Sequence, residues 1–191
     1  TRHAETVQNL NNQLTGRFSV TTDRGKEQIR KLIKRLEKEK IDVVFSSDLP
    51  RCVEIVKAIN NAYGTPFILS QKLREKSQGK FEGKDVRNIN WDSLPGDFET
   101  KKLPGGESLK EVRDRIKSFI GMLMADFLEK NVLIISHGGT SKVMIGFLMG
   151  KDLKESIFDL HFDNCSLSVF DIDSSGNCNP ILVNETDFLE D

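Results

Sequence analysis

The stretch Asn131-Val132-Leu133-Ile134-Ile135 is hydrophobic over almost its whole length, with no alternation of polar residues. Such a run predicts a strand that is buried on both faces, which is typical of a parallel sheet covered by helices on each side. Shorter apolar runs predict further strands at residues 41–45, 66–69, 166–171 and 180–184.

Between these strands, apolar residues recur at the three- and four-residue spacing of amphipathic helices. Ser108 and Glu111 stand at the spacing of a capping box, which marks the start of one helix. Strands that alternate with helices predict an α/β fold, a three-layer sandwich whose mostly parallel sheet carries helices on both faces. The predicted helices cover residues 25–40, 48–63, 108–129 and 140–149.

Residues 75–106 break this rhythm, because they contain five glycines, two prolines and the single Trp91. We interpret this segment as an insertion that covers a functional site, not as a linker between domains. The chain is then expected to form a single domain over residues 1–191, a length that can bury a full core.

The composition limits the kind of partner. There are 28 basic and 29 acidic residues, and this balance argues against nucleic acid or a membrane surface as a partner. No apolar run approaches the roughly 20 residues that a bilayer-spanning helix needs. The three cysteines have no paired spacing, which favours a reducing compartment, and no metal-ligand spacing occurs. We therefore expect a cytoplasmic protein with no metal and no cofactor.

Two predicted strands end in residues that suit a phosphate group. His137, with Gly138 and Gly139 behind it, follows the strand at 131–135, and Arg51 follows the strand at 41–45. Ligands of open α/β sheets bind beyond the carboxyl ends of the strands, and the N–H groups of a helix start suit an anion. Arg51 alone would be interpreted as a solvated surface residue. Because it follows its strand as His137 follows the strand at 131–135, a functional role is favoured.

The helix that would hold Arg51 has its own start signals. Ser47 or Asp48 is expected to cap it, and Pro50 suits its first turn. The guanidinium of an arginine there leans back toward the strand ends and offers planar donors to phosphate oxygens.

Near the beginning of the chain, Arg2 is followed by His3, so a second histidine stands beside a group that suits a phosphate. Histidine can be a neutral nucleophile or a charged phosphate ligand near neutral pH, so two such groups predict a phosphoryl-transfer site. A parallel sheet needs a strand to deliver His3, because neighbouring strands would otherwise leave N–H and C=O groups unpaired. We therefore expect residues upstream of Thr1.

Six short motifs in chain order resemble those of the histidine phosphatase, or phosphoglycerate mutase-like, superfamily. Each alone is weak, but the ordered set spans nearly the whole chain and is specific. They are Arg2-His3-Ala4-Glu5-Thr6 with Asn9; Thr22, Gly25 and Gln28; Ser46-Ser47-Asp48-Leu49-Pro50-Arg51; Leu73-Arg74-Glu75 with Gly79 and Glu82-Gly83; Pro104-Gly105-Gly106-Glu107-Ser108; and Ser136-His137-Gly138-Gly139.

The resemblance implies a role for each matching residue. His3 would be the nucleophile that becomes a phosphohistidine, and Glu75 would be the general acid and then the base that activates water. Arg2, Arg51 and a cationic His137 would stabilise charge on the transferring oxygens. Asn9 and the Gly138 N–H would contact phosphate or substrate.

The resemblance also orders the candidate activities. Mutases of this family carry an arginine-rich insertion after the catalytic Glu, whereas residues 76–106 contain a single arginine, Arg87. This favours hydrolysis of a small phosphomonoester, as in the family's small phosphatases that act on alpha-ribazole 5′-phosphate, sugar phosphates or phosphoserine. Phosphoglycerate mutase-type transfer, a protein phosphohistidine phosphatase and a non-catalytic phospho-ligand binder remain alternatives. The expected partner is a small-molecule substrate, and a homodimer is left open.

Overall fold

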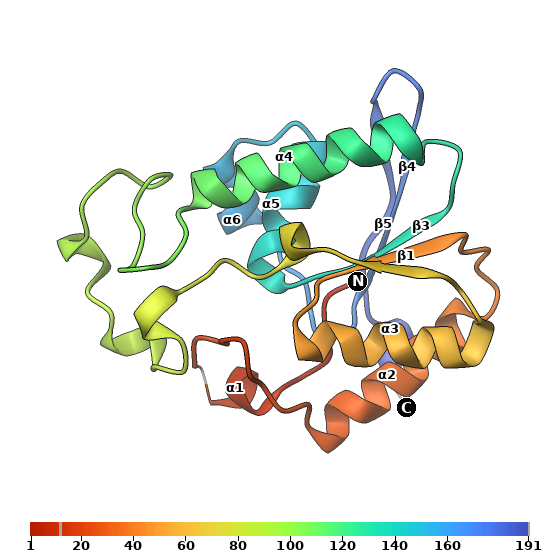
Figure 1. Ribbon diagram of the computed structural model, residues 1–191, viewed down its shortest axis with the longest axis horizontal. Coiled ribbons are helices and arrows are strands. Elements are labelled where there is room, and N and C mark those ends of the chain that lie inside the picture. The colour runs from red at the N-terminus through yellow and green to blue at the C-terminus, as the bar shows by residue number, and fades with distance from the viewer. Residues whose placement is uncertain (12, 191) are drawn as a thin grey trace.

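A three-stranded parallel sheet lies at the centre of the computed structural model, which describes residues 1–11 and 13–190 (Figure 1). The strand order is β2-β1-β3, with β1 between the other two. The strands are β1 (Val43–Ser46), β2 (Phe67–Leu69), β3 (Val132–Ile135), β4 (Leu167–Ile172) and β5 (Cys178–Glu185). The α-helices are α1 (Val7–Leu10), α2 (Asp23–Leu36), α3 (Pro50–Tyr63), α4 (Leu109–Asp126), α5 (Gly138–Leu148) and α6 (Leu153–Asp159).

Helices cover both faces of the sheet, as the sequence predicts, with α4 above the strands and α2 and α3 below them in Figure 1. Strand β1 shows why, because its side chains alternate between two cores. Val44 packs with α2 and α3, whereas Val43 and Phe45 pack with α4 and α5. Phe45 also meets the ring of Phe119 edge to face at a centroid distance of 5.5 Å. Burial on both faces explains the uninterrupted apolar runs.

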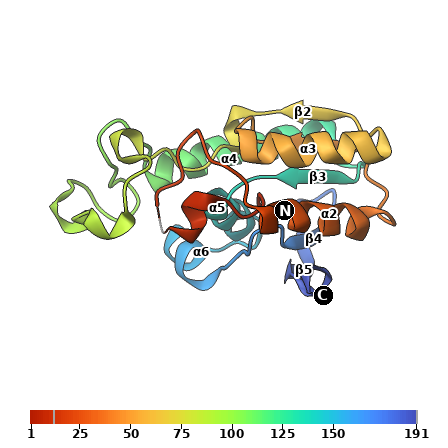
Figure 2. The same ribbon diagram turned by 90° about the horizontal axis from the view of Figure 1, so that it is seen from below.

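The first residues of the chain lie beside the end of β3. Arg2 forms a parallel bridge with Ser136, and the His3 N–H donates to the Ser136 carbonyl at 2.9 Å. On the other side, the Cys165 N–H donates to the Arg2 carbonyl at 3.2 Å. Figure 2 shows β4 and β5, the antiparallel hairpin that follows Cys165, beside this segment. The pairing places His3 next to His137.

The predicted capping box at Ser108 and Glu111 is present at the start of α4. The predicted cap of α3 is wrong, since Leu49 holds the N-cap position and no side chain caps this helix. Ser47 and Asp48 have other partners, described below. The short helices α1 and α6 were not predicted, because neither is long enough to show a periodic apolar pattern. No helix in the described part of the chain is long and apolar enough to span a membrane.

Segment 75–106 forms irregular loops and single turns at the left of Figure 1. Its first residues, Glu75, Lys76 and Gln78, line the cavity of the candidate site. Farther along, the Gly83 N–H donates to the Leu14 carbonyl at 2.8 Å, which joins the segment to the loop after α1. The predicted insertion thus contributes one wall of the site.

Helix α2 fastens the residues that follow His3. The Thr22 hydroxyl donates to Glu5 Oε1 at 2.7 Å, and the Glu5 N–H donates to Gln28 Oε1 at 2.9 Å. A Cβ at Gly25 would lie 2.3 Å from the Glu5 carbonyl oxygen, so only glycine allows this approach. The spacing of Thr22, Gly25 and Gln28 is therefore a positioning device for the chain around His3.

A matched pair of helix substitutions tests this contact. Gly25→Ala should lower the free energy of unfolding by about 2 kcal/mol, because the added methyl group overpacks the contact with Glu5. Gly121→Ala in α4, where a Cβ would meet nothing within 4 Å, should raise it by about 0.5–1 kcal/mol through helix propensity. Urea denaturation measures both, and shifts in the same direction would contradict the packing described here.

Candidate active site

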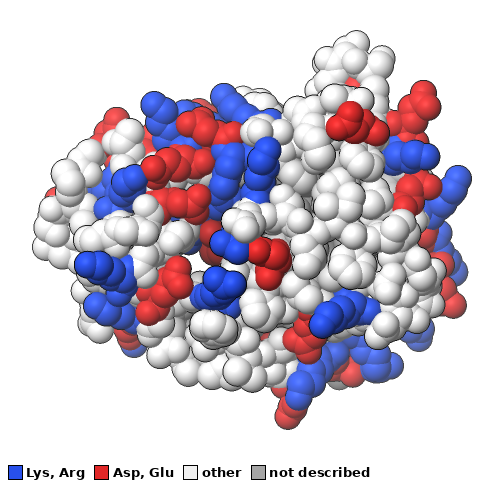
Figure 3. Space-filling model, viewed as in Figure 1, with Lys and Arg blue, Asp and Glu red and all other residues white. Residues whose placement is uncertain are grey.

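The residues predicted to act on phosphate meet where β1, β3 and the N-terminal segment end. A cavity of about 480 Å³ opens there. Arg2, His3, Asn9, Glu75 and Gly138 line it, whereas Arg51 and His137 are not among its lining residues. Acidic and basic side chains are interspersed over the face of the molecule in Figure 3, so the site is not part of a broad basic surface.

A larger hollow of about 580 Å³ lies between β3, β4 and the end of α4. Its lining is mostly apolar, and Arg2 is the one predicted site residue that contributes to it. The smaller cavity is therefore the candidate active site, since the titratable groups converge there.

His3 is buried, with 2% of its surface exposed, and its ring orientation is fixed by the backbone. Nδ1 lies 2.7 Å from the Ala4 carbonyl oxygen, and because a carbonyl only accepts, Nδ1 carries the proton. Nε2 then keeps its lone pair. Burial, followed by the positive charges of Arg51 and Arg2, lowers the pKa of His3 well below its ordinary value of 6.5. The ring is therefore neutral near pH 7 and keeps a lone pair on Nε2.

His137 lies beside it, with the two ring centroids 5.2 Å apart. Its Nδ1 accepts a hydrogen bond from Arg51 Nε at 3.0 Å, so Nε2 holds the proton and donates to Ser47 Oγ at 2.8 Å. Burial, then Arg51 and His3, lower the pKa of His137 well below 6.5. The family resemblance implies a cation here, whereas the ring is neutral in this structure.

Arg51 occupies the first turn of α3 and is 1% exposed. Its Nη1 donates to the Gly16 carbonyl at 2.9 Å, and its Nη2 is buried with no hydrogen-bond partner among the described residues. Arg2 resembles it, because Nη1 donates to the Phe162 carbonyl at 2.7 Å while the buried Nε has no partner in the described chain. Burial lowers the pKa of both guanidinium groups. Buried, unused donors on two cations beside His3 suit the oxygens of a phosphoryl group.

The Glu75 carboxylate lies at the N-terminus of α5, beside Gly139. Its two carboxylate oxygens accept from the backbone N–H groups of Gly139 and Thr140, each at 3.1 Å. The Lys76 N–H also donates to Oε1 at 2.9 Å. A Cβ at Gly139 would lie 2.8 Å from Oε1, so the second glycine of the Gly138-Gly139 pair makes room for the carboxylate.

Three ties hold the segment that carries Glu75. Asp48 binds Arg74 through two hydrogen bonds of 2.6 and 2.5 Å, which is why Asp48 is not a helix cap. The Ser136 hydroxyl donates to the Leu73 carbonyl at 2.9 Å, and the Ser77 N–H donates to Glu107 at 2.9 Å. Residues from four of the six sequence motifs therefore hold the Glu75 carboxylate in position.

The two predicted substrate contacts both line the cavity. Asn9 is held by the Thr6 N–H and hydroxyl, which donate to its Oδ1 at 3.1 and 3.0 Å. Gly138 is the first residue of α5, and a Cβ on it would come within 3.4 Å of Arg2 Nε.

Several polar residues of the site were not predicted from the sequence. Ser47 orients His137, while Lys76, Gln78 and Lys142 line the cavity. Lys142 could have been found, because it lies four residues after Gly138 on a predicted helix and so shares its face. Lys76 and Gln78 lie in the irregular segment, where no periodic pattern places side chains.

Comparison with known proteins identifies the family. The sequence profile described as "Histidine phosphatase superfamily (branch 1)" matches residues 1–185. The chain belongs to the histidine phosphatase superfamily. It is 31% identical over 177 residues to "Putative phosphoserine phosphatase 2" of Hydrogenobacter thermophilus, covering 87% of this chain and 85% of that protein. It is 27% identical to "Probable phosphoglycerate mutase GpmB" of Erwinia tasmaniensis, over 89% of this chain and 82% of the relative.

Solved structures share the fold. The alpha-ribazole phosphatase of Shigella flexneri superimposes with a TM-score of 0.87 at 23% sequence identity, over 96% of this chain and 94% of that one. At this level of identity the likeness establishes the architecture of this histidine phosphatase, and its substrate is argued separately below.

The buried neutral histidines predict a pH dependence of stability. In the unfolded chain each imidazole takes a proton near pH 6.5, whereas the native state keeps His3 and His137 neutral, so stability falls as the pH falls below 6.5. Each ring should contribute a loss of about 1 kcal/mol between pH 6.5 and 5.5. Urea denaturation of His137→Gln should show a loss about 1 kcal/mol smaller than that of the parent protein. Equal losses would mean that His137 is not neutral in the native state.

Proposed function

We propose that this histidine phosphatase hydrolyses a small phosphomonoester through a covalent phosphohistidine at residue 3. The observation that carries the proposal is the His3 ring itself. Its Nδ1–H is committed to the Ala4 carbonyl, and its Nε2 lone pair lies in a buried site with unused N–H donors on Arg2 and Arg51. A histidine used only for packing would not need two cations beside it.

In the first step, His3 Nε2 attacks phosphorus, so that a P–N bond forms while the P–O bond to the leaving alcohol breaks. Arg2 and Arg51 stabilise the negative charge on the transferring oxygens, and the Gly138 N–H and Asn9 contact the substrate. The phosphoryl group adds negative charge next to His137, which favours protonation of that ring and gives a third positive group. Glu75 delivers a proton to the leaving oxygen.

In the second step, Glu75 acts as a carboxylate. It takes a proton from water, the resulting hydroxide attacks phosphorus, and the P–N bond breaks to release inorganic phosphate and free His3. The short contacts from α5 and from Lys76 hold the carboxylate in one place for both proton transfers.

Hydrolysis is favoured over mutase-type transfer by the segment after Glu75. The mutases that this chain resembles carry an arginine-rich insertion at this point of the sequence. Arg87 is the single arginine of residues 76–106, and it is bound to Asp85 by three hydrogen bonds of 2.6 to 3.1 Å. Water is therefore the proposed acceptor.

Substitution of the nucleophile tests the proposal. With p-nitrophenyl phosphate as substrate and a chelator present, the parent protein should release nitrophenol. His3→Ala should lower kcat/KM by at least about a thousandfold, because no other group can take the phosphoryl group. Equal turnover by both proteins would remove His3 from the mechanism.

The role of Glu75 is tested by the dependence on the leaving group. Glu75→Gln should lower kcat/KM for an alkyl phosphate by about a hundredfold or more, since an alkoxide needs a proton to leave. The loss on p-nitrophenyl phosphate should be at least about tenfold smaller, because nitrophenolate leaves without one. The same loss on both substrates would contradict the general-acid role.

A further inference from the structure

Two lysines in the cavity have no part in the mechanism proposed above. Lys76 directly follows Glu75, and Lys142 lies on α5 four residues after Gly138. Both side chains are half-buried, and both line the 480 Å³ cavity.

The ammonium groups of these lysines keep unused donors. Lys142 Nζ donates one hydrogen bond, to the Ile157 carbonyl at 2.8 Å, and Lys76 Nζ lies 5.6 Å from the centre of the Trp91 ring. Neither forms an ion pair within the described residues. An ammonium has three donors, and a half-buried ammonium whose donors are not all used is costly. The cavity therefore offers N–H donors and positive charge to something that enters it.

The position of the lysines identifies which part of a substrate they face. The transferred phosphoryl group belongs at His3, between the guanidinium groups of Arg2 and Arg51, whose two charges match a phosphate dianion. Glu75 marks the leaving oxygen, and its carboxylate is electrostatically coupled to both lysines. Lys76 also faces the negative charges of Glu107 and Glu111, whereas Lys142 faces the positive charge of Arg2. When Glu75 holds the proton that it delivers, Lys142 leaves positive charge on that side, which a negative charge on the leaving group would balance.

Gln78 adds an acceptor to the same cavity. Its Oε1 is buried and has no hydrogen-bond partner among the described residues. A hydroxyl or ammonium group on the substrate would satisfy it, which fits a leaving group with a donor beside its acid.

We infer that the site selects phosphomonoesters whose leaving alcohol carries an acidic group, a carboxylate or a second phosphate, held by Lys142 and Lys76. The inference rests on the proposed hydrolase function and adds a specificity-determining role for these two lysines.

A series of three substrates on one carbon chain tests the inference. These are 3-hydroxypropyl phosphate, 3-(phosphonooxy)propanoate and propane-1,3-diyl bisphosphate, which differ only in the remote group. The parent protein should have a kcat/KM about tenfold higher or more for at least one acidic member than for the neutral one, as one charge-assisted hydrogen bond provides. The preferred member distinguishes a carboxylate from a phosphate.

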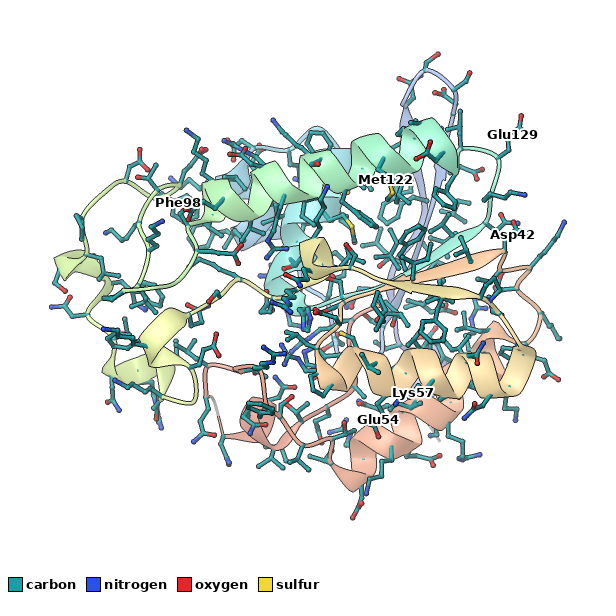
Figure 4. All side chains as sticks on the ribbon, viewed as in Figure 1. Asp42, Glu54, Lys57, Phe98, Met122 and Glu129 are labelled. Atoms are coloured by element: carbon teal, nitrogen blue, oxygen red, sulfur yellow. The ribbon has the colours of Figure 1, made fainter. Side chains whose placement is uncertain are left out.

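Variants assign the preference to the lysine. Lys142→Met should reduce the ratio of acidic to neutral kcat/KM at least about fivefold, mainly through KM, and Lys142→Arg should preserve it. Lys57→Met, on α3 in Figure 4, serves as the matched control and should leave the ratio unchanged. The inference is overturned if the parent protein shows no preference, or if Lys142→Met leaves the ratio intact. Failure to hydrolyse p-nitrophenyl phosphate at all would instead overturn the proposed function, and this inference with it.

Discussion

Two guanidinium groups, the buried Arg51 and the half-buried Arg2, form no ion pair among the described residues, and the site depends on this constraint. Arg51 is 1% exposed, and like Arg2 it has a buried nitrogen with no hydrogen-bond partner in the described chain. Removing such charges from water is costly unless an opposite charge replaces the solvent. The fold limits this cost by keeping His3 and His137 neutral and by directing Nη1 of each arginine at a carbonyl. In the proposed mechanism the phosphate of the substrate, bound between the arginines, would remove the rest, so the positive charge and the neutral His3 would have one explanation.

The surrounding structure works to hold these groups in place. Pairing of the N-terminal segment with β3 brings His3 beside His137, and the close approach of α2 at Gly25 fixes the residues that follow. Glu75 comes from an irregular segment, and it depends on ties from Asp48, Ser136 and Glu107, which belong to three separate elements. The motifs therefore form a hydrogen-bonded network around the Glu75 carboxylate and the His3 imidazole, the two groups that react in the proposed mechanism.

Long periodic elements could be predicted from the sequence. A strand buried on both faces has an uninterrupted apolar run, and a helix with one buried face has apolar residues at every third or fourth position. The strand at 131–135 and the helix after Ser108 are examples. Ser47 shows the limit, since a hydroxyl after a strand suits a helix cap and only the fold shows that it serves His137 instead. The charge state of His137 was also out of reach, because it depends on a hydrogen bond from Arg51, 86 residues away in the chain.

Capture of the covalent intermediate tests the central claim most directly. The protein is mixed with a phosphomonoester, quenched in base within one turnover and digested, and the peptides are analysed by mass spectrometry. A phosphohistidine is stable in base and labile in acid, so we predict a phosphoryl group on His3 that is lost on acid treatment and is absent from His3→Ala. Turnover by the parent protein with no phosphate on residue 3, or with the label on another residue, would contradict the account.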